Sequence, residues 1–276
     1  MKNIPKICHF LWTKGAALSW LQLLSIISFR RYNPDWEIVL YLTKQTPGEL
    51  GVNTYVPDYT GNDYFKLIEK LDYVKIKEID LVAEGIGLDK HGILASDILR
   101  VRLLHELGGV YSDFDTLWLK PMSEFKNIHC IGNPGNFETT ACFYEFTKGH
   151  HNNSNIISES HGAYLQSIIE EQNNIKPPYN DYQVFNSSLL NRKYPDYNSI
   201  TIAYPRVLAI DYKTLYPYST FEMERLFVYE DLTPIEDRGV IGIHWFNGNR
   251  LSKLYVNRDR PLDCSMTTIL KEEGYI

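Results

Sequence analysis

The chain has 276 residues, of which 44% are hydrophobic and 22% are charged, as in folded globular proteins and unlike disordered ones. Its formal net charge of -6 argues against a nucleic-acid-binding protein, because such proteins need a basic face to neutralise phosphates. No Pro/Gly/Ser-rich linker divides the chain, so we expect a single domain over residues 1–276.

Neither the N-terminus nor the cysteines favour a secreted or membrane-spanning protein. The N-terminus lacks the apolar core of a signal peptide, and the apolar run Leu18–Phe29 is interrupted and too short to span a bilayer. Cys8, Cys130, Cys142 and Cys264 lie far apart, so we expect neither a zinc site nor a disulfide framework. We therefore predict a cytoplasmic protein without a transmembrane segment, which leaves peripheral membrane contact open.

The first 42 residues have the pattern of a strand, a helix and a second strand. Ile4–Trp12 is a strand candidate, Ser19 can cap an apolar helix that runs to about Tyr32 and stops at Pro34, and Trp36–Leu42 is the next strand. Such a unit forms a parallel sheet, with ligands bound beyond the carboxyl ends of its strands. Trp12, the last residue of the first strand, lies at that edge.

Further elements alternate along the chain. A helix is predicted over Ser96–Leu107, with Ser96 as its N-cap and Gly108 as its stop, and Val110–Phe114 is predicted to be a strand end. The other candidates are helical pieces at Asp63–Leu71, Asn155–Glu171 and Asp181–Leu190, and strands at Ile200–Tyr204 and Val240–Trp245.

Asp113 and Asp115 follow a double glycine and an apolar strand. Alternation along a strand points both carboxylates to one side and turns Phe114 into the core. Two adjacent carboxylates suit a divalent cation such as Mg²⁺ or Mn²⁺, whose shell phosphate oxygens can complete. An Asp-x-Asp is common by chance, and the alternative is a solvated turn, but the end of a sheet strand favours the metal site.

Two charged residues of the preceding helix face inward. Helical spacing puts Asp97 and Arg100 on the arc of Val101 and Leu104. Buried charges are tolerated when they are paired or bound to a ligand, so a structural Asp97–Arg100 ion pair and a functional role are both open.

Near the C-terminus, His244 ends an apolar strand and precedes a polar loop that contains glycine. A neutral imidazole there could complete a metal shell or contact a phosphate. The alternative is an ordinary buried or surface histidine.

Several blocks together resemble glycosyltransferase family 32, which includes yeast initiating mannosyltransferases and bacterial capsule enzymes, and more distantly the clostridial glucosylating toxins. The blocks are residues 4–12 (IPKICHFLW), 33–37 (NPDWE), 95–100 (ASDILR) and 108–115 (GGVYSDFD). This resemblance implies a GT-A fold, that is, an α/β nucleotide-sugar transferase with a Rossmann-like mixed sheet flanked by helices. It divides the domain into a nucleotide-sugar-binding half, 1–122, and an acceptor-side half with a C-terminal closing loop, 123–276.

The resemblance also implies roles for individual residues. Trp12 would stack on the nucleotide base, Asp97 and Arg100 would contact the donor sugar and diphosphate, and Tyr111 would line the pocket. Asp113 would reach ribose or sugar and Asp115 would ligate Mn²⁺, or Mg²⁺. Asn155 is similar to a family asparagine beside the donor sugar, and His244 to the histidine that opens the C-terminal motif.

The C-terminal motif departs from the family, where His-x-x-x-Gly-Ser-Trp is usual. Asn249 and Arg250 occupy the Ser and Trp positions. Asn249 can supply an oxygen ligand and Arg250 can neutralise a leaving diphosphate, so we expect both to contact the nucleotide and Asn249 to complete the metal shell.

We therefore predict transfer of a sugar from a nucleoside-diphosphate sugar to a glycan, a lipid-linked or a protein acceptor. UDP-sugars are favoured over GDP-mannose, and the family implies retention of configuration. Arg100, Asp113, Asp115 and Asn155 are the expected catalytic residues. One rival is a haloacid-dehalogenase-like phosphatase, although its motif would need Thr116 one position later. The other is a sugar-binding module without catalysis.

Overall fold

The computed structural model describes most of the chain. The described residues are 4–50, 59–86, 92–127, 142–147, 150–177, 179, 181, 184–204, 206–211, 215–216, 220–229, 232, 240–257 and 263–276.

Strands and helices alternate regularly in the first half of the chain and less regularly in the second. The strands are β1 (Ile7–Thr13), β2 (Glu37–Thr43), β3 (Val74–Ile79), β4 (Gly109–Ser112), β5 (Thr116–Trp118), β6 (Cys142–Thr147), β7 (His150–Ser158), β8 (Val207–Asp211), β9 (Leu215–Tyr216) and β10 (Gly242–His244). The helices are α1 (Trp20–Tyr32), α2 (Phe65–Ile68), α3 (Gly92–Leu107), α4 (Ala163–Asn174), α5 (Ser187–Lys193), α6 (Tyr197–Ala203), α7 (Thr220–Phe227), α9 (Arg250–Val256) and α10 (Ser265–Glu272), with a 3-10 turn at Met122–Asn127.

Among the described residues, seven strands form one mixed sheet in the order β3-β2-β1-β4-β7-β6-β8. β3, β2, β1 and β4 are parallel, β7 runs antiparallel to β4 and β6, and β8 runs parallel to β6. The chain moves outward from β1 to β3 and then returns to place β4 on the other side of β1. The crevice between the carboxyl ends of β1 and β4 is thus the place where open α/β sheets bind ligands.

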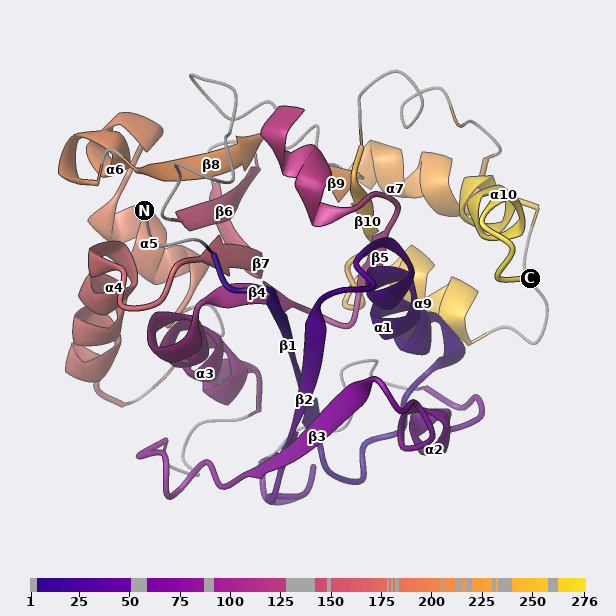
Figure 1. The fold of residues 1–276 in the computed structure, drawn as a ribbon, viewed down its shortest axis with the longest axis horizontal. Helices are drawn as coiled ribbons and strands as arrows, with labels where there is room; N and C mark the ends of the chain where they lie inside the picture. The colour runs from indigo at the N-terminus through magenta and orange to yellow at the C-terminus, as the bar shows by residue number, and fades with distance from the viewer. Residues whose placement is uncertain are drawn as a thin grey trace.

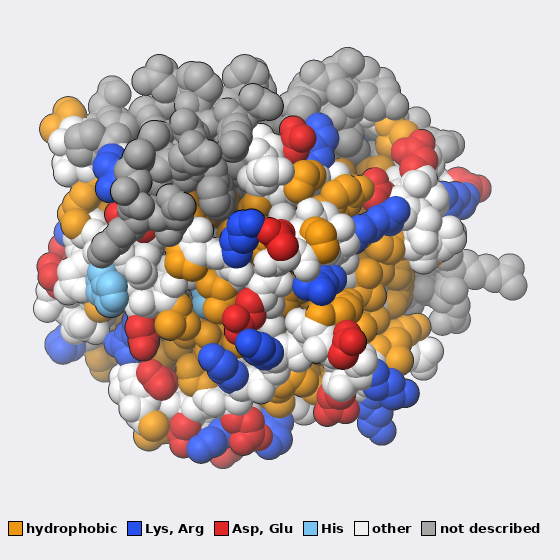
Figure 2. Space-filling model, viewed as in Figure 1, with side chains coloured by type: hydrophobic (Ala, Val, Ile, Leu, Met, Phe, Trp, Pro, Cys, Tyr) orange, Lys and Arg blue, Asp and Glu red, His pale blue; other side chains and the backbone are white. Residues whose placement is uncertain are grey.

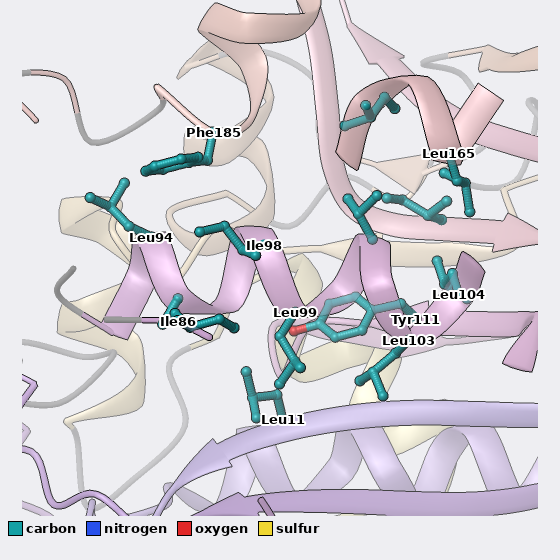
Figure 3. Packing of buried hydrophobic residues seen from close by; sticks show 14 of the residues in the cluster. Leu11, Ile86, Leu94, Ile98, Leu99, Leu103, Leu104, Tyr111, Leu165 and Phe185 are labelled. Carbon is teal, nitrogen blue, oxygen red and sulfur yellow. The ribbon is translucent and has the colours of Figure 1, made fainter. Parts of the chain in front are cut away.

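Helices cover both faces of this sheet (Figure 1), because β1 is apolar on both sides. Phe10 and Trp12 pack on the face that α1 covers, whereas Leu11 packs on the face of α3. Figure 3 shows Leu99 and Leu103 of α3 beside Tyr111 of β4. The three layers hold the strand ends in fixed positions.

A second sheet brings the C-terminal part of the chain to the end of β4. In the described residues its order is β5-β10-β9, and β10 pairs antiparallel with β5 so that His244 lies opposite Thr116. Because Thr116 directly follows Asp115, this register places His244 beside the second aspartate.

The double glycine between α3 and β4 permits a close approach that no other residue could make. Gly109 has a φ of +98°, and a Cβ there would lie 2.3 Å from the carbonyl oxygen of Ile7 in β1. Gly108 has a φ of +67° and ends α3, as predicted. The pair therefore sets how α3 leads into β4.

The predicted N-terminal elements are confirmed with small shifts at their ends. Ser19 caps α1, and its side chain accepts a hydrogen bond from the Gln22 N–H while Gln22 bonds back to the cap. The helix ends at Tyr32, before Pro34. The predicted helix at Asp63–Leu71 is reduced to one turn, α2. The Asp63 carboxylate accepts the N–H groups of Leu18 and Phe65 at its start.

Two predictions of local structure are wrong, and a third holds only in part. Ser96 does not cap α3, which begins at Gly92. The predicted helix Asn155–Glu171 is confirmed only from Ala163, in α4, because Asn155–Ser158 belongs to strand β7, where Ile156 and Ile157 are buried on opposite faces of the sheet. The run Ile200–Tyr204 is mostly helical in α6, because the Asp196 carboxylate accepts the Ser199 N–H and starts a helix there.

Two other predicted elements hold in part. The predicted strand end Val110–Phe114 is too long, since β4 stops at Ser112 and a turn follows. The predicted helix Asp181–Leu190 is observed only from Ser187, as α5, and residues 182–183 lie outside the described residues.

The described surface mixes charges of both signs. In the face of Figure 2, Lys and Arg side chains lie among Asp and Glu side chains. Along the edge strand β3, Lys75 pairs with Glu37 at 3.1 Å and Glu78 with Lys14 at 2.8 Å, which discourages pairing of that edge with another chain. Within the described ranges, no helix has the length and hydropathy needed to cross a membrane.

The described cysteines, Cys8, Cys142 and Cys264, are all buried. Cys130 lies outside the described residues.

Candidate active site

Two groups of polar side chains meet at the carboxyl end of β4. One group comes from α3 and β4 and surrounds Asp113. The other comes from β10 and the loop after it and surrounds Asp115. Phe114 between them is 4% exposed and packs against Phe10 and Trp12, so it turns into the core as predicted.

Arg100 is the centre of the first group. It is 5% exposed, and its Nη1 donates to the Asp113 carboxylate at 3.1 Å. Its Nη2 donates to the Ser96 hydroxyl at 2.8 Å and lies 3.5 Å from the Asp97 carboxylate. The guanidinium carbon also lies 4.6 Å from the centre of the Tyr111 ring, within the range of a cation–π contact.

Asp113 is held at both oxygens. Besides the contact with Arg100, its Oδ1 accepts from the Tyr111 hydroxyl at 3.1 Å, while 27% of the side chain remains exposed. Burial and the neighbouring Asp115 raise the pKa of Asp113, although Arg100 opposes this. The guanidinium of Arg100 keeps its charge, because Asp113, Tyr111 and Asp97 outweigh the burial that would lower its pKa.

Asp97 is 2% exposed and is part of the predicted ion pair with Arg100. Its Oδ1 also accepts from the Asn186 side chain at 3.4 Å. The structural ion pair between Asp97 and Arg100 is therefore present in the molecule. A contact of Asp97 with a donor sugar stays a prediction.

Asp115 is the centre of the second group. Its Oδ2 accepts the Asn247 N–H at 2.9 Å, and its backbone carbonyl accepts the Trp245 N–H at 2.9 Å. Its Oδ1 is buried without a hydrogen bond and lies 3.3 Å from Nε2 of His244. Burial pushes the pKa of Asp115 up, but His244 and the Asn247 N–H outweigh it, so the pKa lies below its ordinary value.

The loop after β10 is strained where it wraps Asp115. Phe246 has a φ of +49°, which is uncommon for a bulky residue, and its ring stacks on His244 with centroids 3.9 Å apart. This conformation lets both neighbours of Phe246 direct their N–H groups to Asp115. The carboxylate, the imidazole and the loop form one unit.

The geometry fits a divalent cation at Asp115 and His244. An unbonded carboxylate oxygen and an imidazole nitrogen 3.3 Å apart are suitable ligand atoms for Mn²⁺ or Mg²⁺. Among the described residues, no three His, Cys, Asp or Glu side chains form a ready-made metal site. The remaining ligands would have to come from the substrate, as in sites completed by phosphate oxygens.

The other predicted site residues have partners that the sequence did not suggest. Asn155 is 1% exposed and bonds the buried Thr116 hydroxyl at 3.1 Å. Asn249 caps α9, since its Oδ1 accepts the Leu251 N–H at 2.8 Å. Arg250 is exposed at the first position of that helix. A role for these residues in the chemistry stays a prediction.

Trp12 lies at the carboxyl end of β1, as expected, but it is 1% exposed. Its indole packs edge-on against Phe114, with centroids 4.8 Å apart, and its Nε1 donates to the Ala16 carbonyl at 3.0 Å. Stacking on a base would require the ring to leave this packing.

The sequence reasoning missed two supports of the site. Ser96 orients Arg100, whereas the sequence pattern predicted Ser96 to be the N-cap of the helix. The Asn247 N–H donates to the Asp115 carboxylate, and a backbone contact of this kind cannot be predicted from residue types.

Comparison with protein families and solved structures gives the following relatives. Residues 1–131 match the family described as "Glycosyltransferase sugar-binding region containing DXD motif". Among solved structures, the PaToxG glycosyltransferase is 18% identical over 73% of this chain and 74% of its own, with a TM-score of 0.48. GlyE from Streptococcus pneumoniae TIGR4 is 12% identical over 99% of this chain and 64% of its own, with a TM-score of 0.45. A search of curated proteins gave no match.

The TM-scores are below 0.5, so the fold assignment rests on the sheet order described above and not on these likenesses. The family match is of a different kind, because it covers the four blocks that resembled family 32 and includes Asp113-Phe114-Asp115 as the DXD motif. Residues 1–131, slightly less than half of the chain, are therefore similar to glycosyltransferase sugar-binding regions that contain a DXD motif, and this similarity supports a transferase.

Proposed function

We propose that the chain is a metal-dependent glycosyltransferase that uses a nucleoside-diphosphate sugar. The observation that carries this proposal is the buried Asp115 Oδ1, which faces His244 Nε2 at 3.3 Å beside the charged Arg100. A carboxylate with a lowered pKa and an imidazole would hold Mn²⁺ or Mg²⁺, which when bound neutralises charge on a diphosphate leaving group.

The residues of the chain would do the rest by position and charge. Arg100 supplies a fixed positive charge next to Asp113, and Ser96 and Tyr111 hold that pair in place. A prearranged charge lowers the barrier because the site need not reorganise as the leaving group develops charge. Asp113, which is partly exposed, would contact ribose or sugar.

The donor and the acceptor are proposed at the level that the motifs support. UDP-sugars are favoured over GDP-mannose because of the resemblance of the motif blocks to the glucosylating toxins. The acceptor is a glycan, a lipid-linked or a protein acceptor, and the sugar keeps its configuration. We propose one GT-A domain for residues 1–276, whose C-terminal loop contributes Asn249 and Arg250 to donor binding.

The site does not favour the two rivals. A phosphatase of the haloacid-dehalogenase type would need a threonine two residues after its second aspartate. Thr116 instead directly follows Asp115, and it is buried and bonded to Asn155. A sugar-binding module without catalysis would have no use for a held Arg100–Asp113 pair beside a potential cation site. Nucleotide-sugar hydrolysis separates the module from an enzyme.

The test is the release of nucleoside diphosphate from a panel of UDP- and GDP-sugars, with and without Mn²⁺. Asp115→Asn should keep the fold and lose turnover by on the order of a hundredfold, because an amide is a poor ligand for a hard cation. Asp35→Asn, which changes an exposed carboxylate, is the matched control. Near-normal turnover of Asp115→Asn with unchanged Mn²⁺ affinity would remove Asp115 from the metal site.

A further inference from the structure

A pocket of about 210 Å³ lies apart from the candidate active site. Its walls come from the start of β6, the end of β7, the first turn of α4 and the segment that follows α6. They include Cys142, Glu159, Tyr164, Ala203, Tyr204 and Arg206.

Strand register places this pocket near the start of β4, at the opposite end of that strand from Asp113. Ser158, which also lines the pocket, pairs with Gly109 at the start of β4, whereas Asn155 pairs with Ser112 at its end. Three residues along a strand cover roughly 10 Å. The pocket is therefore a separate feature and not an extension of the site around Asp115.

The polar part of the pocket is an ion pair. Arg206 Nη2 donates to the Glu159 carboxylate at 3.1 Å, and the Glu159 side chain is only 12% exposed while that of Arg206 is 52% exposed. A charged ligand would have to separate this pair and leave a buried charge uncompensated, which is costly. Hydroxyl groups can bind without separating it, because a carboxylate accepts and a guanidinium donates hydrogen bonds.

The remaining walls are apolar. Tyr164 and Tyr204 meet edge to face with ring centroids 5.5 Å apart, and Leu165 and Ala203 complete this side. Burial raises the pKa of the Cys142 thiol to about 12, so at neutral pH it is a protonated, weakly polar group and not a nucleophile. The pocket is therefore suited to binding and not to covalent chemistry.

We propose that this pocket binds one neutral sugar residue. A sugar ring has C–H faces that pack on aromatic and apolar walls, and hydroxyl edges that bond a carboxylate and a guanidinium. The volume is below the roughly 300–1,000 Å³ of pockets for drug-sized ligands, which agrees with a single ring. The proposal deepens the proposed function by adding a second carbohydrate subsite, on which a glycan acceptor or product could rest.

The experiment uses ligand-observed NMR with the full chain and four probes: D-glucose, D-galactose, D-mannose and N-acetyl-D-glucosamine. Ala203→Trp fills the pocket from an exposed position, so folding should be retained. Arg206→Met removes the donors and is made together with Glu159→Gln, so that no buried charge loses its partner. Ile202→Trp is the matched control, because Ile202 is 82% exposed and does not line the pocket.

At least one sugar should bind to the parent chain in a saturable way. Its affinity should fall at least tenfold in Ala203→Trp and weaken in the double variant Arg206→Met with Glu159→Gln, and it should be unchanged in Ile202→Trp. The proposal is overturned if none of the four sugars binds, if Ala203→Trp binds like the parent, or if inorganic phosphate displaces the sugar.

A further variant separates this proposal from the proposed function. Asp115→Asn should keep sugar binding in the pocket even though it loses donor turnover. Sugar binding lost together with donor turnover in that variant would show that the sugar occupies the active site, and this would also overturn the proposal.

Discussion

At the level of single residues, the burial of Trp12 favours a structural role over the base stacking that the family resemblance implies. The indole is 1% exposed and packs with Phe10, Phe114 and Leu40 in one apolar cluster. Trp12→Ala should therefore lower the free energy of unfolding by about 3–5 kcal/mol. Chemical denaturation measures this change.

UDP binding to the same variant provides the second half of the test. A core role predicts little change in the dissociation constant for the fraction of Trp12→Ala that remains folded. A selective loss of UDP affinity with unchanged stability would instead support stacking on the base.

His9 makes stability depend on pH. It is buried, and its Nε2 lies 2.8 Å from the Gly108 carbonyl, while Tyr41 lies on its other side. Burial lowers the pKa of His9 from 6.5 to about 4, with Lys77 and Glu37 acting as more distant charges. The histidine is therefore neutral in the folded chain at pH 5.

The unfolded chain takes up a proton at His9 below about pH 6.5, whereas the folded chain takes it up only near pH 4. Stability from this group is thus complete above pH 6.5 and falls as the pH is lowered toward 4, by up to about 3 kcal/mol. Urea titrations at pH 7 and pH 5 should show a smaller loss for His9→Gln than for the parent.

The sequence patterns predicted which residues belong to the site better than they predicted which residues these contact. Helical spacing predicted that Asp97 and Arg100 face inward, and both side chains are buried in the structure. The contact of His244 with Asp115 did not follow from the sequence, because it depends on the register between β10 and β5. The sequence contains no local signal for pairing between strands more than 100 residues apart.

At the level of elements, local signals predicted those elements that local interactions build. The capping box of α1 and the glycine stop of α3 are short-range devices, and both are observed. The β-branched run before Tyr204 indicated a strand, but the cap at Asp196 makes it a helix. The helix predicted at Ile156 and Ile157 is not observed, because the burial of these two residues on opposite faces depends on the pairing of β7 with β4 and β6.

The start of α9 offers a test of the closing loop. Arg250 is the first residue of this helix, where a positive charge is unfavourable because the helix dipole is positive at that end. Helix stability therefore does not explain the arginine, and contact with a diphosphate would. Arg250→Ala should leave the melting temperature unchanged or slightly higher.

The same variant should bind a nucleotide sugar more weakly by about 1.5–3 kcal/mol, the usual worth of a charge-assisted contact. Steady-state kinetics with saturating Mn²⁺ measures this loss. Lys253→Ala, on the same helix, is the control. If both variants behave like the parent, Arg250 is a solvated surface residue and does not close the site.

At the level of the whole molecule, residues from both halves of the chain form the same sheets and the same apolar core. Strand β7 of the second half lies between β4 and β6 in the large sheet, and β10 pairs with β5 of the first half. The apolar cluster around α3 includes Ile156, Leu165 and Phe185, all from the second half. Figure 3 shows Leu165 and Phe185 near α3. The division at residue 122 is thus one of expected function and not of folding.

This sharing predicts that the family-matched segment cannot fold alone. A fragment of residues 1–131 would leave the edge of β4 unpaired, would expose the apolar face of α3 that packs on α4, and would leave Asp115 without His244 and the Asn247 N–H. Unpaired strand edges and large exposed apolar faces promote aggregation. We expect the fragment to be insoluble or to lack a cooperative unfolding transition.

The full chain, in contrast, should unfold in one transition, monitored by circular dichroism at the helix signal and by tryptophan fluorescence. Coincident curves from the two probes indicate one cooperative unit, because four of the five tryptophans lie in the first half whereas the helix signal comes from both halves. A fragment 1–131 that is monomeric and melts cooperatively would show that the first half is an independent domain. The second half would then be a separate unit docked on it, and the pairing of β10 with β5 would be an interface between domains.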